Sequence, residues 1–192
     1  MEEITASAEP IPNHEETSAV SGAGAFRLLR DLAFSVVLAV VLIVFIYQPV
    51  KVEGTSMMPG LTDQDRIFIN KYEYKIGSGQ IQRSDLIVFH FPLDPSQSYI
   101  KRVIAVPGDE VEIVDGDVYV NGQMQEETYV PAEYRDHIAL RRETVPRNKY
   151  FVLGDHRSSS NDSRTWGFVD RSLIYGKAVF VYWPPEKIGR VH

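Results

Sequence analysis

The sequence predicts a mostly β protein that carries one N-terminal transmembrane helix. Seven short segments rich in Val, Ile, Phe and Tyr are bounded by turn residues, which is typical of β-strands. A long uncharged run precedes them and is typical of a membrane anchor. No long amphipathic helix pattern follows the run, so we do not expect a parallel sheet built from strand–helix–strand units.

Composition excludes several classes of protein. The 192 residues suffice for one domain of ordinary size. Residues 1–26 carry five of the 26 acidic residues and no Lys or Arg, so the remaining 21 acidic and 20 basic residues nearly balance. A balanced domain gives no nucleic-acid footprint. The absence of Cys excludes disulfides and a cysteine nucleophile, and the five His show no close ligand spacing, so we expect no metal and no cofactor.

The N-terminal region divides into a tail and an anchor. Residues 1–26 are rich in Glu, Ser, Ala, Pro and Gly and are predicted to be a disordered acidic tail. Residues 32–47 contain 16 uncharged residues without a polar stripe, and the uncharged run reaches 19 residues at Val50. A cleaved signal peptide is the alternative, but 31 residues precede the run and no Ala-x-Ala follows it. We therefore expect a retained transmembrane anchor helix over residues 27–50, with Pro49 ending the helix.

The charges beside the anchor suggest an orientation. Arg27 and Arg30 precede the uncharged run, whereas Lys51 follows it. This distribution slightly favours a cytoplasmic N-terminus.

Residues 51–192 are predicted to form one β domain. Asp115-Gly116 separates two alternating segments and is a strong hairpin signal. Residues 123–147 are polar and poor in strand formers, so we expect a long loop or an insertion there. The predicted strands are Arg66–Tyr72, Asp85–Phe91, Tyr99–Val106, Glu110–Val114, Asp117–Val120, Lys149–Leu153 and Lys177–Trp183.

A candidate nucleophile follows the uncharged run directly. Residues 54–59 read Gly-Thr-Ser-Met-Met-Pro and present Ser56 among small residues. Seven residues separate Pro49 from Ser56, and an extended chain of that length covers at most about 25 Å. Ser56 is thus expected near the bilayer surface. A serine hydroxyl needs a nearby base to become an effective nucleophile.

Lys101 is the candidate base. Strand alternation places Tyr99, Lys101, Val103 and Ala105 on one face, so the amine has apolar neighbours. Burial lowers the pKa of a lysine, and a base useful at neutral pH needs a drop of about 3 units from ~10.4, or roughly 4 kcal/mol. Arg102 cannot serve, because a guanidinium does not deprotonate in proteins. On the strand pattern alone, a lysine whose stem packs while its ammonium reaches water remains an alternative.

A third polar stretch covers residues 154–167. It follows an apolar strand and is dense in Asp, Arg and Ser. Asp162 and Arg164 are candidates for an ion pair that fixes the loop, and a serine of this stretch could orient the lysine amine. An ordinary polar surface loop is the alternative interpretation.

Taken together, three stretches resemble the type I signal peptidases of bacteria and organelles, which are membrane-anchored serine proteases with a Ser–Lys dyad. The stretches are Gly54–Pro59, Tyr99–Asp109 and Gly154–Gly167. Their order and the anchor before the first stretch also fit, and the resemblance covers roughly residues 30–183.

The resemblance implies roles for individual residues. Ser56 is the nucleophile and Lys101 the general base. Ser160 orients the lysine, and Asp162 and Arg164 form an ion pair that shapes the site. The Ser56 backbone N–H serves the oxyanion hole, where charge develops only in the transition state.

Three positions depart from the common pattern of the family. Gly54 stands where many members carry a serine whose hydroxyl completes the oxyanion hole, although other members also carry glycine. Gly60 replaces a usual threonine, and His156 a usual asparagine. None of the three removes the dyad, but Gly54 leaves the second oxyanion donor open.

The resemblance also implies a fold, substrates and a location. The fold is an irregular antiparallel β domain with a smaller β insertion, roughly within residues 110–147. The substrates are secretory pre-proteins, cleaved after small residues of the Ala-x-Ala type. The protein lies in a cell membrane, or in an organellar or thylakoid membrane, with a single pass and the catalytic domain on the extracytoplasmic side.

Three other functions compete with this hypothesis. A membrane-anchored binding domain explains the anchor and strands but not the coincidence of the three stretches. Self-cleaving repressors share the Ser–Lys chemistry but need a DNA-binding domain, for which the acidic residues before the anchor leave no room. A specialised peptidase with few clients cannot be separated from a general one by sequence.

Overall fold

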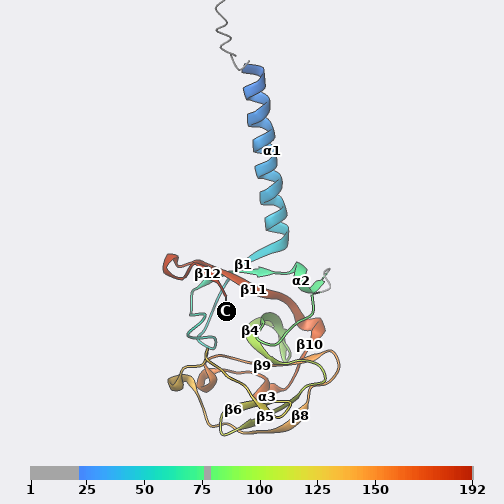
Figure 1. Ribbon diagram of the computed structural model, residues 1–192, viewed down its shortest axis with the longest axis vertical. Coiled ribbons are helices and arrows are strands. Elements are labelled where there is room, and N and C mark those ends of the chain that lie inside the picture. Colours follow the sequence, from blue (N-terminus) through green and yellow to red (C-terminus); the bar gives the residue numbers. More distant parts are fainter. Residues whose placement is uncertain (1–21, 76–78, 192) are drawn as a thin grey trace, which may run out of the picture. The chain divides into compact units, whose positions relative to one another are not determined.

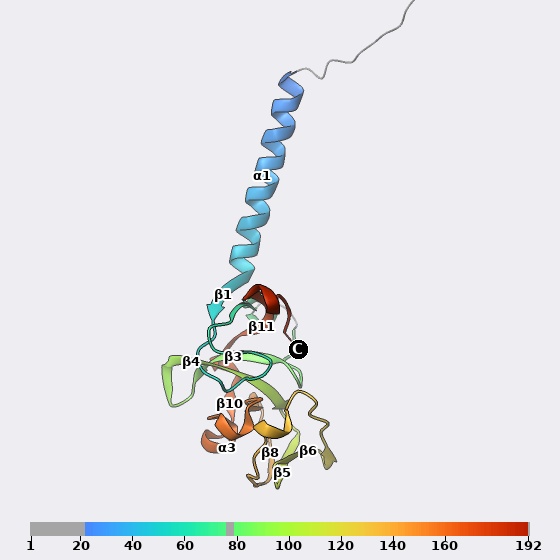
Figure 2. The ribbon, with the colours of Figure 1, turned by 90° about the vertical axis from the view of Figure 1, so that its left-hand side faces the viewer.

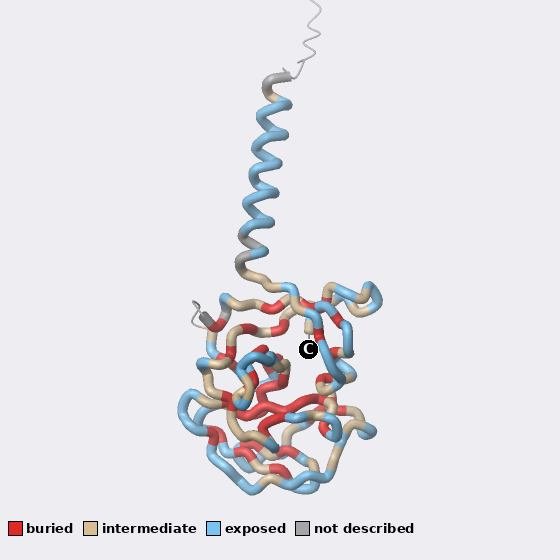
Figure 3. Tube along the Cα trace, turned by 180° about the vertical axis from the view of Figure 1, so that it is seen from behind, coloured by how far each residue is buried: buried red, intermediate tan, exposed pale blue. Residues whose placement is uncertain are grey.

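The computed structural model describes residues 22–75 and 79–191. The chain divides into two units, residues 1–41 and residues 42–192. Helix α1 (Gly22–Ile46) begins in the first unit and ends in the second. Large apolar side chains such as Phe26, Leu32 and Val40 are exposed along it, and Figure 3 shows the helix as an exposed segment. No helix in the described ranges combines the length and the mean hydropathy needed to cross a membrane.

Both ends of the predicted anchor differ from the structure. Residues 22–26, assigned to the disordered tail, are helical, because each added residue extends an existing hydrogen-bond ladder. The remainder of that tail, residues 1–21, lies outside the described residues. At the other end, the helix stops at Ile46, and strand β1 (Tyr47–Lys51) follows. Pro49 is tolerated in β1 because this strand pairs on one side only, with β2.

The second unit is built from two antiparallel sheets, so the prediction of a mostly β protein is confirmed. Figure 1 shows the strands and the short helices between them. In the described chain the larger sheet has the order β1-β2-β11-β3-β4-β9-β10, with β12 paired to β11. Its strands beyond β1 are β2 (Arg66–Asn70), β3 (Leu86–Phe91), β4 (Asp94–Ala105), β9 (Lys149–Leu153), β10 (Val169–Asp170), β11 (Ile174–Trp183) and β12 (Gly189–Arg190).

The smaller sheet has the order β7-β6-β5-β8. Figure 2 shows β5, β6 and β8 together at one end of the domain. The hairpin predicted at Asp115-Gly116 is present, since both residues adopt the positive φ that a tight turn requires. The strands are β5 (Glu110–Val114), β6 (Asp117–Val120), β7 (Gln123–Met124) and β8 (Leu140–Thr144).

Strand β8 corrects the prediction that residues 123–147 are poor in strands. Four of its five residues are exposed, because β8 is an edge strand that pairs only with β5. Its polar composition therefore reflects an exposed edge and not a loop. Short helices complete the chain: α2 (Tyr72–Lys75), α3 (Ser163–Trp166) and the 3-10 helices Ala132–Tyr134, Arg157–Ser159, Arg171–Leu173 and Pro185–Lys187.

Three clusters of buried apolar side chains hold the domain together. One joins Met57 and Leu61, just after the candidate nucleophile, to the strands around β2 and β11. Another joins Val111 and Val118 of the smaller sheet to Phe151 of β9. The core thus anchors the loop that carries Ser56 and fixes the smaller sheet against the strand that leads into residues 154–167.

Candidate active site

Ser56 lies in a loop whose first residues are held by hydrogen bonds to residues 63–65. The Val52 N–H donates to the Asp65 carbonyl at 2.8 Å, and the Gln64 N–H donates to the Val52 carbonyl at 2.9 Å. Gly54 adopts a φ of +92°, which favours glycine, and its N–H donates to Asp63 Oδ1 at 2.9 Å. The buried Met57 side chain then ties the loop to the core. These contacts leave Ser56 little freedom to move.

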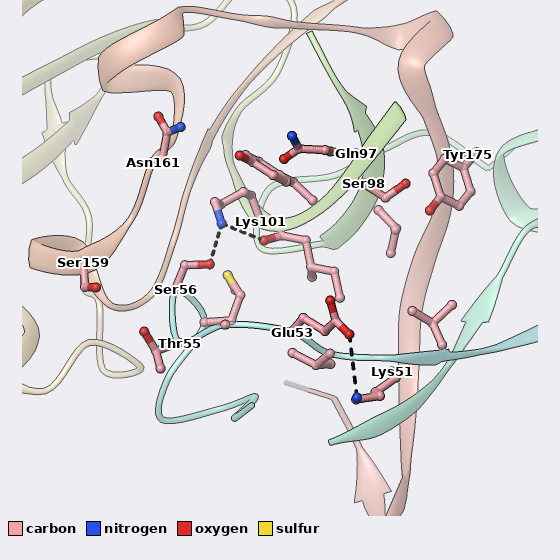
Figure 4. Close-up of a pocket in the computed structure, with 17 residues that line it drawn as sticks. Lys51, Glu53, Thr55, Ser56, Gln97, Ser98, Lys101, Ser159, Asn161 and Tyr175 are labelled. Carbon is pink, nitrogen blue, oxygen red and sulfur yellow. Dashed lines mark hydrogen bonds and ion pairs between the residues drawn. The ribbon is translucent and has the colours of Figure 1, made fainter. Parts of the chain in front are cut away.

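Lys101 meets Ser56 directly, as Figure 4 shows. The Lys101 Nζ lies 2.6 Å from Ser56 Oγ and 3.1 Å from the Ile100 carbonyl oxygen. Lys101 lies on strand β4, and its side chain points toward Ser56. The 2.6 Å distance is within the range at which a base takes a proton from a hydroxyl.

Burial prepares Lys101 to act as a base. The residue is 3% exposed. Burial lowers the pKa of Lys101 to about 8, although the nearby Asp162 and Asp155 carboxylates raise it, and Arg164 lowers it further. The desolvation effect wins because none of these carboxylates forms a hydrogen bond with the amine in the described chain.

Residues 154–160 close over the Ser56 loop. The His156 N–H donates to the Ser56 carbonyl at 3.1 Å. A Cβ at Gly154 would lie 2.2 Å from Ser160 Oγ and 2.5 Å from the Ser56 carbonyl oxygen, so only glycine allows this approach. Ser160 Oγ is buried and has no hydrogen-bond partner among the described residues. The role of Ser160 in orienting Lys101 therefore stays a prediction.

Asp162 and Arg164 form an ion pair at the base of this loop. The Arg164 Nε and Nη2 groups each donate to Asp162 at 2.8 Å. Asp162 is fully buried and also accepts from the Gly154 N–H at 3.0 Å. Arg164 donates to the Arg157 carbonyl at 2.8 Å. The pair thus joins the beginning and the end of the loop at residues 154–164.

A groove of about 580 Å³ opens onto Ser56 and Lys101. Its walls are residues 50–57, which run from the end of β1 into the turn that carries Ser56, and residues 97–101 of β4. Val88, Ser159, Asn161 and Tyr175 complete the lining. A groove with one wall on the extended strand β4 is suited to an extended peptide.

The three departures from the resemblance have different surroundings. A Cβ at Gly54 would meet nothing within 4 Å, so only its positive φ restricts that position. A Cβ at Gly60 would make ordinary contacts, 3.7 Å from the Met57 carbonyl oxygen and 3.9 Å from Asp155 Oδ2. The His156 ring lies 4.1 Å from the Tyr134 ring, and its Nδ1 lies 3.3 Å from the Thr55 carbonyl oxygen.

Two buried ion pairs next to the site were not anticipated. Arg102 donates twice to Asp155, at 2.8 and 2.7 Å. Arg157 donates twice to Glu127, at 2.8 and 2.6 Å. Strand alternation does place Arg102 on the face opposite Lys101, but no local signal marks Glu127. Among the described residues, no three His, Asp or Glu side chains converge so as to hold a metal ion.

Comparison with known proteins gives consistent results. The model of the family "Signal peptidase, peptidase S26" matches residues 25–183. The chain is 38% identical over 169 residues to a probable signal peptidase I-1 of Synechocystis sp., with 83% of each chain covered. It is 36% identical over 173 residues to a signal peptidase I of Leptolyngbya laminosa, covering 85% of this chain and 82% of the relative.

Two further relatives come from other bacteria. A signal peptidase IB of Staphylococcus aureus is 36% identical over 156 residues, covering 73% of this chain and 80% of the relative. The crystal structure of a signal peptidase I from Enterococcus faecalis V583 is 36% identical and covers 51% of this chain and 96% of that chain, with a TM-score of 0.45.

Proposed function

The chain belongs to the signal peptidase family, peptidase S26, and we propose that it cleaves signal peptides with Ser56 as nucleophile and Lys101 as general base. Membership of this family makes the protein a serine protease that removes signal peptides from secretory pre-proteins. The observation that carries the residue assignment is the 2.6 Å contact between the buried Lys101 Nζ and Ser56 Oγ.

In the first half of the reaction, Ser56 Oγ attacks the carbonyl carbon of the scissile bond while neutral Lys101 takes the hydroxyl proton. The oxyanion that forms accepts a hydrogen bond from the Ser56 backbone N–H. The tetrahedral intermediate then collapses, and the Lys101 ammonium donates its proton to the departing amine. The mature protein leaves, and the signal peptide stays attached to Ser56 as an ester.

In the second half, Lys101 is neutral again and takes a proton from a water molecule. The resulting hydroxide attacks the ester carbonyl. The bond to Ser56 Oγ breaks, the proton returns to Oγ, and the signal peptide leaves with a free carboxylate. One amine thus serves as base in both halves of the reaction and as acid between them.

The lowered pKa of Lys101 makes this chemistry accessible near neutral pH. With a pKa of about 8, about one tenth of the amine is neutral at pH 7. At the ordinary lysine value the neutral fraction would be a few hundred-fold smaller, about 4 in 10⁴. Burial of Lys101 therefore contributes directly to the rate.

The groove supports the proposed preference for small residues before the cleavage site. A substrate extended between residues 50–57 and 97–101 directs alternate side chains toward the same wall. We expect shallow pockets at these positions to exclude bulky side chains, in line with Ala-x-Ala sites. Replacing the alanine just before the cleavage site by leucine in the substrate should abolish cleavage.

We further propose that the segment at residues 27–50 attaches the protein to a lipid bilayer, with the catalytic domain on the extracytoplasmic side. The uncharged residues 32–47 and the exposed apolar side chains of α1 support this proposal. Alkaline carbonate extraction of membranes tests attachment, and protease protection of intact cells tests orientation. Release of the protein into the carbonate supernatant would contradict membrane attachment.

The first experiment is cleavage of a pre-protein with an Ala-x-Ala site in detergent, between pH 6 and 10. Wild type should cleave, whereas Ser56→Ala and Lys101→Ala should not. Ser96→Ala, at an exposed position of β4, and Lys149→Ala on β9 are matched controls that should retain activity. Cleavage by both site variants at the wild-type rate would refute the dyad, whereas a wild type that does not cleave would favour a binding domain without catalysis.

A further inference from the structure

The segment Glu127–Tyr129 lies between β7 and the 3-10 helix Ala132–Tyr134 and contributes a carboxylate to the interior of the domain. Glu127 is 5% exposed. Both of its oxygens accept from Arg157, at 2.8 and 2.6 Å. Each side chain of the pair is almost fully buried. A buried bidentate pair allows only a narrow range of geometries, so it fixes the position of Arg157.

Arg157 in turn holds the loop over the active site. Its Nε donates to the Gly154 carbonyl at 3.0 Å, and its own carbonyl accepts from Arg164 at 2.8 Å. Gly154 is the residue that makes room for Ser160 and for the Ser56 carbonyl. A displacement of Arg157 would therefore move the loop that contacts Ser56 and carries the charged groups acting on the Lys101 amine, Asp155, Asp162 and Arg164.

Tyr129 contacts Arg102, the residue that follows Lys101 on β4. Its hydroxyl donates to Glu127 Oε1 at 3.0 Å, and the Arg102 guanidinium lies 4.0 Å from the centre of its ring. Arg102 follows Lys101 in β4 and is paired with Asp155. Tyr129 thus contacts β4, the strand that carries Lys101, and Glu127 contacts the loop at residues 154–157.

A second set of contacts also links the smaller sheet to the loop at residues 154–164. Asp136 pairs with Arg164, and a Cβ at Gly116 would collide with the Asp136 carbonyl oxygen at 2.0 Å. The turn of the β5–β6 hairpin is therefore packed directly against residue 136. The smaller sheet and the chain that returns from it form a rigid support for the catalytic loop.

We propose that Glu127 and Tyr129 are positioning residues for the catalytic lysine, which hold Arg157 and Arg102 so that the loop over Lys101 stays closed to water. This inference rests on the proposed function, because it assigns these residues to the reaction of Ser56 and Lys101. It gives the smaller β region a role in catalysis although neither residue lines the groove.

The groups around Lys101 determine how this role is measured. The charged groups that act on the amine are Asp155, Asp162 and Arg164, from residues 154–164, and its neighbour on β4 is Arg102. From the β4 face, the Tyr99 ring lies 5.3 Å from the amine. A loosened loop admits water, which stabilises the charged amine and moves its pKa up toward the ordinary lysine value.

The experiment measures the Lys101 amine directly, without relying on cleavage. The full-length protein is labelled with acetic anhydride across pH 6–11, and mass spectrometry of the Lys101 peptide gives the pKa of the amine. The same preparations are assayed for kcat and KM on the pre-protein. Glu127→Gln removes the buried carboxylate charge with little change of shape, and the matched control is Glu112→Gln, whose partner Arg142 is exposed on the smaller sheet.

For Glu127→Gln, the pKa of Lys101 should rise by about one unit, which lowers the neutral fraction and kcat at pH 7 about tenfold. KM should change less than twofold, and kcat should recover above the new pKa. Glu127→Asp should restore part of the rate, and Glu112→Gln should match wild type. The unpaired Arg157 charge left by Glu127→Gln acts in the opposite direction, so a fall of the pKa would show a charge effect and overturn positioning.

A double variant separates position from charge. Glu127→Leu combined with Arg157→Met removes both buried charges, so no unpaired ion destabilises the fold. Its labelling pKa should also rise. If none of the Glu127 variants folds, Tyr129→Phe, which removes one hydrogen bond, should show a smaller shift in the same direction. Folded variants with the labelling pKa and kcat of wild type would overturn the inference.

The two readouts also separate this inference from the proposed function. If wild type fails to cleave the pre-protein while the Glu127 variants still shift the labelling of Lys101, the proposed function fails and the positioning of the amine stands. If wild type cleaves and Ser56→Ala does not, while no variant shifts the labelling, the positioning inference alone fails.

Discussion

Lys101 and Arg102 are neighbours on β4 and each is 3% exposed, yet burial has opposite consequences for them. Arg102 is directed to one side of the strand and meets a carboxylate, Asp155, with two hydrogen bonds. Lys101 is directed to the other side and meets a hydroxyl and a carbonyl. A buried cation with a bonded counter-ion is part of the structure, whereas a buried amine without one is inclined to lose its proton.

The Arg102–Asp155 ion pair also has a desolvation cost, which is visible at Asp155. Burial raises the pKa of this carboxyl, and the Arg102 guanidinium acts against that increase. The pair therefore holds two desolvated charges that depend on each other. On this side of β4 burial serves the fold, and on the other side it serves the proposed reaction.

The largest effect on kcat should come from replacing Lys101 by arginine, the residue type that stands at position 102. Lys101→Arg places a cation that does not deprotonate against Ser56. Removing a general base lowers rates by roughly 10²–10⁴-fold, and we expect kcat of signal-peptide cleavage to fall within or beyond that range. Arg102→Lys is the matched exchange and should reduce kcat much less. Equal losses in the two variants would mean that the two faces of β4 do not differ in function.

Breaking the Arg102–Asp155 pair should give the largest change in stability. Asp155→Asn leaves a buried guanidinium without its counter-charge, and such changes cost about 3–5 kcal/mol in the free energy of unfolding. Replacing both residues, Arg102→Met with Asp155→Leu, should recover most of that loss. Urea unfolding followed by tryptophan fluorescence measures both variants. A single variant as stable as wild type would show that the pair adds nothing.

The pH dependence of the free energy of unfolding should reveal the lowered pKa of Lys101. Below pH 8 the folded and unfolded states both bind the proton, and the penalty of burying the charge is complete. Between pH 8 and 10.5 only the unfolded lysine keeps its proton, so the free energy of unfolding rises with pH. A difference of about 2.5 pKa units corresponds to about 3 kcal/mol.

Lys101→Met is the control for this titration, because it keeps the volume of the side chain and removes the titrating amine. Urea midpoints of both proteins at pH 7, 8, 9 and 10 give the comparison. The rise should be present in wild type and absent in the variant. Parallel curves for the two proteins would show that Lys101 titrates normally.

The sequence predicted local features better than long-range ones. Strands β5, β6 and β9 have the predicted bounds, because alternation and turn residues are local signals. Strand β1 was missed, since its apolar residues continue the uncharged run and only its pairing with β2 makes it a strand. Ser56 and Lys101 were selected by short motifs 45 residues apart, and the structure brings them together.

Glu127 shows where such prediction ends. It lies in a polar stretch, and its partner Arg157 is 30 residues away along the chain. No periodic pattern or turn signal distinguishes this glutamate from its exposed neighbour Glu126. Its burial becomes visible only in the folded chain, where it contacts Arg157 and Tyr129.

The smallest predicted effect concerns Gly60, which lies beside the Asp155 carboxylate. A Cβ there would be 3.9 Å from Asp155 Oδ2 and 3.7 Å from the Met57 carbonyl oxygen, so a side chain fits without collision. In Gly60→Thr, the hydroxyl should donate to Asp155, and the unfolded chain should lose conformational freedom. Each of these effects stabilises a protein by about 0.5–1 kcal/mol.

The kinetic result of Gly60→Thr is the sharper part of this prediction. Asp155 also raises the pKa of Lys101, so a hydroxyl that satisfies this carboxylate tests whether the two sides of β4 are coupled. With independent sides, urea unfolding should show the gain in stability while the pH profile of kcat stays that of wild type. Gly60→Ala fills the same space without a hydroxyl and separates the hydrogen bond from the loss of glycine. A shifted pH profile in the threonine variant alone would mean that Asp155 transmits changes from the structural pair to the catalytic amine.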